Sequence, residues 1–360
     1  MNRATMGLDG TDAAPRAVAV IGCGFVADLY MRSFRQHPDV AVIGAWDRDP
    51  ARLAAFARYW SVTAMPSEAA LLEALPHGGV LLNLTNPDAH FEVSRAALVA
   101  GHHVWSEKPL APRMEEARRL HAMARERGCA LASAPSSVLG EAAQTLGHAI
   151  RAGIGGTPRL VYAELDDGFI PQAPYTGWRS ESGAPWPAAD EFAVGCTLEH
   201  AGYYLSWLIA CFGPVRRVAA ASAEIIPDKP ADGPAAPDFS VGVLEFDTVV
   251  ARLTCSIAAP HDHRIRVIGD GGVLEVAEAW NNAAPVRFRR RMVIRRRLLE
   301  HPLGRRIRLR GPTHPKLPRR GAAAMNFALG PLEMLDALAA GQEPRLAGDY
   351  ALHLTEVTLA

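Results

Sequence analysis

A glycine turn near the N-terminus is the first part of the chain that could do chemistry. The apolar, strand-like run 17–21 leads directly into Gly22-Cys23-Gly24-Phe25-Val26-Ala27, and a helical pattern follows. In a G-x-G-x-x-A turn the first glycine permits the tight turn, the second lets a pyrophosphate approach the backbone, and the alanine allows close packing at a helix N-terminus that favours anions. The residues expected to bind a dinucleotide here are Gly22, Gly24, Phe25, Val26 and Ala27.

Asp47 bears on which dinucleotide binds. It ends the second strand-like run and lies 23 residues after Gly24. A carboxylate at this position would hydrogen-bond the adenosine ribose hydroxyls and repel a 2′-phosphate, which favours NAD. The neighbouring Arg48 could pair with that phosphate, so NADP is the alternative cofactor. A plain glycine turn followed by a surface aspartate is the non-functional alternative.

Two more polar clusters follow strand-like runs. Thr85-Asn86-Pro87-Asp88-Ala89-His90 comes after the run 80–84, and Glu107-Lys108-Pro109-Leu110-Ala111 comes after the run 103–106. Ligands of open α/β sheets bind at the carboxyl ends of parallel strands. The further cofactor contacts expected from these clusters are Thr85, Asn86, Pro87, His90, Glu107 and Lys108.

The order of the glycine turn, T-N-P-x-x-H and E-K-P-L-A resembles the Gfo/Idh/MocA family of oxidoreductases, of the glucose–fructose oxidoreductase and inositol dehydrogenase type. The resemblance extends from Ala17 to the last helical pattern. It implies a nicotinamide above the sheet of the first domain and a sugar or polyol between that domain and a second sheet. It also implies that Lys108 touches the reacting hydroxyl.

The second catalytic residue of the family usually lies in a D-x-G-x-H-x-x-D helix. When Glu199 is aligned with the first aspartate of that motif, Tyr203 stands at the histidine and Ser206 at the last aspartate. The resemblance implies that Tyr203 carries the proton, as in family members with a tyrosine there, and Lys108 is the cation expected to lower the pKa of its phenol. The plain alternatives are core packing for Tyr203 and a surface position for Glu199.

His200 lies three residues before Tyr203, on the same helical face, and is the alternative proton carrier. A third alternative is that neither residue is the base. Arg179 follows Trp178 in a loop that resembles the substrate-facing loop of the family, although an exposed arginine is often only solvated. The substrate contacts expected are Lys108, Arg179, Glu199, His200, Tyr203 and His261.

His261 and His263 have the spacing that places two imidazoles on one face of a strand. No third ligand can be identified near them in the sequence, so no metal is expected and His261 is a candidate substrate contact. Asp166 and Asp167 end another strand-like run. They could contact polyol hydroxyls or simply form a turn.

Apolar runs alternate with helical patterns over residues 17–132, which predicts a parallel sheet covered by helices. Beyond residue 135 the strand-like runs bunch together around one long helix, 199–211, which predicts a mostly antiparallel sheet. The fold class is therefore an α/β Rossmann domain followed by an α+β domain. The expected divisions are a disordered tail (1–15), the Rossmann domain (16–136) and a substrate-binding and oligomerisation domain (137–360) whose last helices, 322–340 and 350 onward, are candidates to pack back on the first domain.

The formal net charge is zero, yet residues 287–320 contain 14 of the 38 Lys and Arg and one of the 38 Asp and Glu. Arginines alternate there with apolar residues, which predicts hairpin strands with one charged face. The alternatives are a surface that attracts a phosphate-linked or nucleotide-linked sugar, or another anionic partner. Nucleic acid is not expected, because no recognition module is visible.

Five scattered cysteines without a C-x-x-C pair indicate a reducing compartment. The first fifteen residues lack the apolar run of a secretory signal, and the longest apolar stretch, 202–215, is too short to span a membrane. We expect a cytoplasmic homo-oligomer, dimer or tetramer. The predicted function is NAD(P)-dependent hydride transfer to or from a hydroxyl-bearing carbon of a sugar, nucleotide sugar or polyol. The alternatives are a catalytically inactive nucleotide-binding regulator and an anion-binding protein on the same fold.

Overall fold

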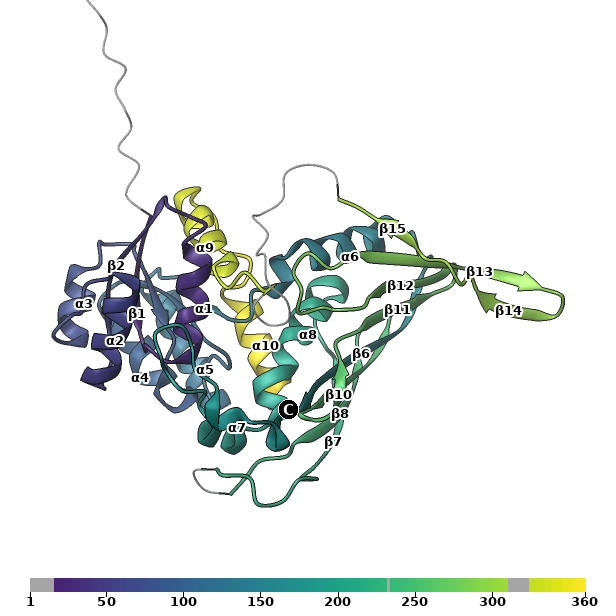
Figure 1. Ribbon diagram of the computed structural model, residues 1–360. Coiled ribbons are helices and arrows are strands. Elements are labelled where there is room, and N and C mark those ends of the chain that lie inside the picture. Colours follow the sequence, from purple (N-terminus) through teal and green to yellow (C-terminus); the bar gives the residue numbers. More distant parts are fainter. Residues whose placement is uncertain (1–15, 232–233, 310–323) are drawn as a thin grey trace, which may run out of the picture.

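The computed structural model describes residues 16–231, 234–309 and 324–360. It consists of two domains side by side, with the last helix between them (Figure 1). The predicted tail (1–15), residues 322–323 and the basic residues from Arg310 to Arg320 lie outside the described residues. The helix predicted from residue 322 begins only at Leu329, because residues 324–328 are not α-helical.

The first domain is built on a five-stranded sheet in the order β2-β1-β3-β4-β5, and every neighbouring pair is parallel. Its central strands β1 and β3 are apolar except for Arg16 and Asn83 and are almost completely buried, as expected when helices cover both faces of a parallel sheet. The predicted parallel sheet is confirmed, with strand ends within about two residues of those expected. The strands are β1 (Arg16–Ile21), β2 (Val40–Trp46), β3 (Val80–Asn83), β4 (His103–Ser106) and β5 (Leu131–Ser133).

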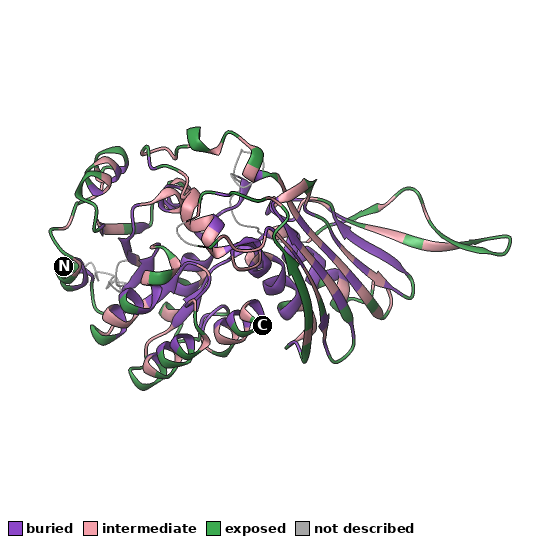
Figure 2. Cartoon of the chain, turned by 90° about the horizontal axis from the view of Figure 1, so that it is seen from below, coloured by how far each residue is buried: buried purple, intermediate pink, exposed green. Residues whose placement is uncertain are grey.

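The helices of the first domain turn buried faces to this sheet and exposed faces to solvent (Figure 2). They are α1 (Phe25–Phe34), α2 (Pro50–Trp60), α3 (Glu68–Ala74), α4 (His90–Val99) and α5 (Met114–Glu126). Helix α2 begins at Pro50 because the carboxylate of Asp49 accepts hydrogen bonds from the amides of Ala51 and Arg52. This cap places Arg52 in the first turn of α2, beside the carboxyl end of β2.

The second domain contains a ten-stranded sheet in which β6 and β9 are parallel and the other pairs are antiparallel. This confirms the predicted mostly antiparallel sheet. Its strands are β6 (Pro158–Phe169), β7 (Arg217–Ala223), β8 (Phe239–Glu245), β9 (Val250–Ser256), β10 (Ala258–Asp262), β11 (Ile265–Gly269), β12 (Gly272–Val276), β13 (Val286–Ile294), β14 (Arg297–Glu300) and β15 (Arg305–Ile307).

Three helices precede β7: α6 (Glu141–Arg151), α7 (Ala188–Val194) and α8 (Cys196–Phe212). The long helix begins at Cys196, three residues before the predicted start. Gly195 makes this start possible, because its φ is +85° and a Cβ on it would lie 2.5 Å from the Cβ of Ala236. The early start places Glu199, His200 and Tyr203 in the first turns of α8.

The last two helices are α9 (Leu329–Ala339) and α10 (Asp349–Leu359). Helix α10 contacts both α5 and α8, and so lies against both domains (Figure 1). The hydroxyl of Tyr350 donates to the carbonyl of Ser206 at 2.7 Å, and Asp349 lies 3.1 Å from the imidazole of His121. Among the described residues, no helix combines the length and apolar character needed to cross a bilayer.

The proline-rich segment 171–187 also joins the domains. The carboxylate of Asp28, on α1, accepts hydrogen bonds from the amide and the hydroxyl of Ser182, at 2.8 and 2.9 Å. Arg32, one turn further along α1, forms an ion pair with Glu181 at 2.8 Å. These contacts hold the segment against the first domain, where it forms one wall of the cavity described next.

Candidate active site

A cavity of about 670 Å³ lies between the carboxyl ends of the first sheet and the second domain. This volume is within the range of ligand sites. The first domain contributes Gly24, Phe25, Val26, Leu29, Arg52, Leu84, Thr85, Asn86, Pro87, Glu107 and Lys108. The second contributes, among others, Asp167, Trp178, Trp186, Glu191, Glu199, His200, Tyr203, His261 and Trp280.

The glycine turn has the shape that a bound dinucleotide requires. Gly22 has a φ of +93°, and a Cβ on it would lie 2.5 Å from the carbonyl oxygen of Leu84. The Cβ position of Gly24, by contrast, faces open space next to the cavity, at the N-terminus of α1. Phosphate oxygens could therefore reach the first amides of α1, with Phe25 and Val26 lining the cavity and Ala27 buried behind them.

Asp47 is buried at the end of β2, and its carboxylate is fully engaged. It accepts from the amides of Cys23 and Asp49, each at 2.8 Å. It also accepts two hydrogen bonds from the guanidinium of Arg52, each at 3.0 Å. Arg48 is exposed and is absent from the cavity lining, whereas Arg52 lines the cavity and contacts Asp47. Arg52 had only a weak signal in the sequence, because a basic residue in the first turn after a helix cap is common on protein surfaces.

The cluster after β3 divides into lining and supporting residues. Thr85, Asn86 and Pro87 line the cavity, and the hydroxyl of Thr85 donates to the side-chain oxygen of Asn83 at 2.6 Å. His90 is fully buried outside the lining, and its ring nitrogens contact the carbonyls of Pro109 and Thr85 at 2.6 and 2.9 Å. The structure therefore places His90 as a support of the two loops and not beside the cavity.

Lys108 points into the cavity from the loop after β4. Its ammonium forms an ion pair with the carboxylate of Glu199 on α8. Burial alone would lower the pKa of Lys108, but the nearby charge of Glu199 outweighs it and holds that pKa above its usual value. The preceding Glu107 is fixed by the hydroxyl of Tyr30, which donates to it at 2.6 Å. Lys108 is therefore a positioned, protonated ammonium.

Tyr203 faces the same cavity from α8, with its ring 5.5 Å from that of Trp280. Lys108 lowers the pKa of this phenol, as expected, but its effect is outweighed. Burial raises the pKa of Tyr203 by more than Lys108 lowers it, so the net pKa lies above the usual value. Tyr203 is therefore a protonated phenol near neutral pH, suited to give up a proton when a neighbouring oxygen becomes negative.

Glu191, on α7, is a member of the site that the sequence did not reveal. Burial raises the pKa of its carboxyl well above the usual value, and the charge of Glu199 and a hydrogen bond with it add to that effect. Glu199 thus links two buried groups, because it forms a hydrogen bond with protonated Glu191 and an ion pair with the ammonium of Lys108. No local pattern marked Glu191, because it lies in the flank of a proline-rich loop and reaches the cavity only through tertiary packing.

The wall formed by the proline-rich segment is aromatic. Arg179 is exposed, bonds to the carbonyls of Thr176 and Trp178, and does not line the cavity. Trp178 lines it instead, with its ring 5.3 Å from that of Trp186. The sequence indicated the right dipeptide, but the tryptophan and not the arginine faces the site.

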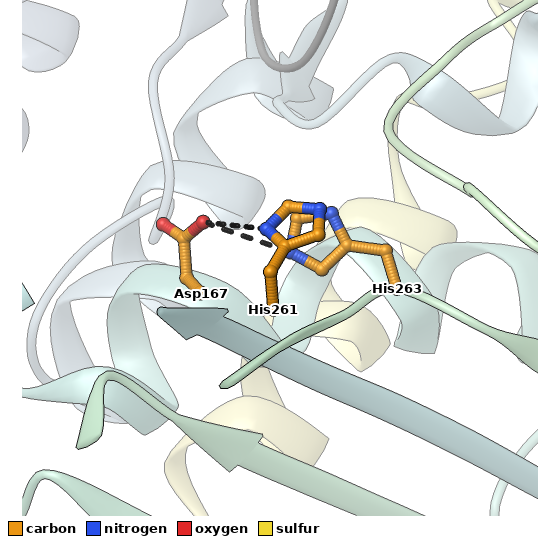
Figure 3. Close-up of side chains that lie close together, drawn as sticks. All are labelled: Asp167, His261 and His263. Carbon is orange, nitrogen blue, oxygen red and sulfur yellow. Dashed lines mark ion pairs between the residues drawn. The ribbon is translucent and has the colours of Figure 1, made fainter. Parts of the chain in front are cut away.

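Histidines gather at the far end of the cavity. His200, on α8, has a pKa lowered to about 3 by burial and then by the charge of Lys108, so its imidazole is neutral. Its Nε2 lies 3.8 Å from a carboxylate oxygen of Asp167. The same carboxylate of Asp167 faces His261 and His263 (Figure 3). It is the third potential ligand that could not be identified near this histidine pair in the sequence.

The arginine-rich hairpin of β13 and β14 projects from the end of the second domain, on the side away from the first domain (Figure 1). Its strands pair as predicted, with exposed arginines and exposed apolar side chains such as Val293 and Leu298. Among the described residues, none that lines the cavity comes from β13, β14 or β15. The hairpin is therefore a separate surface.

Sequence comparison places both domains in one family. Residues 16–134 match the model described as oxidoreductase family, NAD-binding Rossmann fold, and residues 143–275 match the GFO/IDH/MocA C-terminal domain. An uncharacterized oxidoreductase from Synechocystis sp. is 27% identical over 71% of this chain and 66% of its own length. A dTDP-3,4-didehydro-2,6-dideoxy-alpha-D-glucose 3-reductase from Streptomyces antibioticus is 37% identical over 29% of this chain and 33% of its own. The chain thus aligns with between a third and two thirds of the length of these relatives.

Solved structures share the whole fold. A UDP-N-acetylglucosamine 3-dehydrogenase from Acidithiobacillus ferrooxidans superposes with a TM-score of 0.71 at 21% identity, covering 95% of each chain. A 3-ketoreductase from Actinomadura kijaniata, solved with TDP-benzene and NADP, gives 0.72 at 20% identity over 96% of each chain. With its NAD-binding Rossmann domain and its matching second domain, the chain belongs to the GFO/IDH/MocA family of oxidoreductases.

Proposed function

We propose that this protein transfers hydride between NAD(P) and a hydroxyl-bearing carbon of a sugar, nucleotide sugar or polyol. The observation that carries the proposal is the meeting of Lys108, Glu199 and Tyr203 in one cavity with the N-terminus of α1. A helix N-terminus binds a phosphate, and an ammonium beside a phenol handles the proton of a hydroxyl group. The family membership supports the same reaction class.

The residues that would hold the cofactor lie on the first domain. Gly22, Gly24, Phe25 and Val26 form the phosphate turn, and Thr85, Asn86, Pro87 and Glu107 line the path toward Lys108. A bound nicotinamide supplies the hydride chemistry, which the protein's own side chains cannot perform. We propose NAD as the preferred cofactor, because a 2′-phosphate would approach the carboxylate of Asp47. Arg52 lessens that repulsion and keeps NADP accessible.

The protonation states of the site favour the direction of carbonyl reduction. Lys108, Tyr203 and Glu191 all hold protons near neutral pH. A carbonyl oxygen that receives a hydride on its carbon becomes negative and needs a proton at once. We propose that Tyr203 and Lys108, which line the same cavity, donate hydrogen bonds to that oxygen, while the ion pair with Glu199 holds the ammonium in position.

The remaining walls suit a carbohydrate. Trp178, Trp186 and Trp280 offer apolar faces for the C–H groups of a sugar ring, and Asp167 and His261 offer polar atoms for its hydroxyls. The proteins compared above that are named for sugar substrates act on nucleotide-linked sugars. We therefore place nucleotide sugars first among the substrates to test.

A turnover screen tests the function. The full chain would be incubated with NADH or NADPH and a panel of keto-sugars, and in reverse with NAD or NADP and nucleotide sugars, free sugars and polyols, while absorbance of the reduced cofactor is followed. We expect cofactor-dependent turnover with at least one member of the panel. Tight cofactor binding without turnover on any member would instead support the inactive nucleotide-binding alternative.

We also propose that the protein is a cytoplasmic homo-oligomer, dimer or tetramer. All five cysteines are free, which suits a reducing compartment. Exposed apolar residues on the β13–β14 hairpin, such as Val293 at 72% exposure, and the arginines around them could pack against the more acidic remainder of a second copy. Light scattering of the wild type and of Val293→Asp would show an oligomer and its weakening, whereas a monomeric wild type would refute the proposal.

A further inference from the structure

A cluster of potential metal ligands lies where the pairing of β6 and β10 is irregular. It consists of Asp167, His261 and His263. Asp167 lies near the end of β6, and the register of β10 shifts between Ala259 and Asp262, where Asp262 pairs with Asp166. Three potential ligand atoms, one from each of Asp167, His261 and His263, lie within 4.8 Å of one another. Figure 3 shows both imidazoles pointing toward the carboxylate.

Glu278 determines which nitrogen of each imidazole carries its proton. It lies 3.0 Å from Nδ1 of His263 and 3.2 Å from Nε2 of His261. A carboxylate accepts hydrogen bonds, so both of these nitrogens carry hydrogen. In neutral rings the opposite nitrogens, Nε2 of His263 and Nδ1 of His261, then present lone pairs. A carboxylate that holds ligating histidines in this way is the usual outer partner of a metal site.

Both lone pairs face the same oxygen of Asp167. Nε2 of His263 lies 3.6 Å from Oδ1 of Asp167, and Nδ1 of His261 lies 3.9 Å from it. The side chain of His263 is fully buried, and its Nε2 has no hydrogen-bond partner among the described residues. Acceptors that converge without a donor between them repel one another unless a cation or a proton occupies the space.

We propose that Asp167, His261 and His263 bind one divalent transition-metal ion, with Glu278 as the positioning carboxylate. Two imidazoles and one carboxylate are ligands typical of open Zn²⁺ or Fe²⁺ sites. Metal–ligand bonds of about 2.0 Å separate the ligands of a tetrahedral ion by about 3.3 Å. The observed 3.6 and 3.9 Å therefore need only small side-chain movements.

The remaining coordination position would open toward the cavity, because Asp167 and His261 both line it. A metal there could bind an oxygen of the substrate and hold the sugar in position, without any change in the redox state of the metal. This role rests on the proposed function, whereas metal binding itself does not.

The test measures binding in the absence of cofactor and substrate. Untagged, metal-stripped protein would be titrated with Co²⁺, followed by visible absorption, and with Zn²⁺ in competition. We expect one ion per chain. Substitutions Asp167→Asn and His261→Ala should each weaken binding by at least about 100-fold, and Glu278→Gln by about 10-fold to 100-fold. His261 is half-exposed, so its replacement should leave the fold intact.

The matched control is Asp262→Asn. Asp262 lies between the two histidines on the chain, but its carboxylate pairs with Arg264 and is not part of the cluster. Its replacement should leave the affinity for Co²⁺ and Zn²⁺ unchanged. The inference would be overturned by less than one bound ion per chain at saturation, or by an unchanged affinity in His261→Ala and Glu278→Gln. An enzyme without turnover that still binds one ion would count against the proposed function alone.

Discussion

The two walls of the cavity differ in how their polar groups are satisfied. On the first domain, Asp47 accepts four hydrogen bonds, and Thr85 is tied to Asn83. On the second domain, Glu191 and Asp167 are carboxyl groups whose pKa values burial raises, that of Asp167 to about 7. A wall whose polar side chains are already hydrogen-bonded can hold a cofactor without rearrangement. Carboxyl groups with shifted pKa values cluster at functional sites, so they indicate that the second wall exchanges protons or ions.

The largest effect should come from the groups that handle the proton. Tyr203→Phe keeps the ring and removes the proton, and Lys108→Ala removes the ammonium paired with Glu199. Each should lower kcat by about 10² to 10⁴, with the dissociation constant of the cofactor nearly unchanged. Steady-state kinetics and cofactor titration would check this. If His200→Ala abolished turnover while Tyr203→Phe stayed near wild type, the proton would pass through His200 and not Tyr203.

The phosphate turn should be the next most sensitive feature. Gly22→Ala forces a side chain into a φ of +93° and against the carbonyl of Leu84, so we expect cofactor affinity to fall by at least about tenfold. Gly101→Ala is the matched control, because Gly101 has a φ of +84° with open space around its Cβ position. Equal cofactor affinities in the two variants would contradict the close approach at the turn.

Removal of Arg52 should change cofactor choice moderately. In Arg52→Ala the charge of Asp47 loses its two guanidinium hydrogen bonds, so the ratio of NAD to NADP affinity should rise by about tenfold. Arg48→Ala, at an exposed position, should leave the ratio unchanged. Titrations of each variant with NAD and with NADP would measure this ratio. If the ratio changed in Arg48→Ala but not in Arg52→Ala, Arg48 and not Arg52 would be the arginine that affects cofactor choice.

The smallest expected effect is that of alkaline pH on reduction. The pKa of Tyr203 is raised by burial and that of Lys108 by neighbouring carboxylates, against its own burial, so both groups lose their protons only above their usual ranges. The kcat for reduction should therefore stay level between about pH 7 and about pH 9. A steady decline over that interval would indicate a proton donor with a lower pKa.

How much the sequence could predict also differs between the walls. Gly22, Gly24 and Lys108 lie in contiguous motifs whose strand and helix context is visible in the chain, and Tyr203 followed from aligning one helix with the motif of the family that the sequence resembles. Glu191, and the contacts of Asp167 with His261 and His263, could not be assigned in this way, because they depend on side chains far away in the sequence. Arg52 was missed because no motif marks the residue that pairs with Asp47. His90 and Arg179 show the converse, since residues within a recognised motif can point away from the cavity.

The central claim is that the two walls act on one oxygen atom of one substrate. A double-mutant cycle of Lys108→Ala and Tyr203→Phe tests it most directly, with kcat for reduction as the readout. Because both residues serve the same proton transfer, the double variant should be little slower than the slower single variant. If the two losses multiplied instead, Lys108 and Tyr203 would act independently, and the account of a shared proton-handling unit would be wrong.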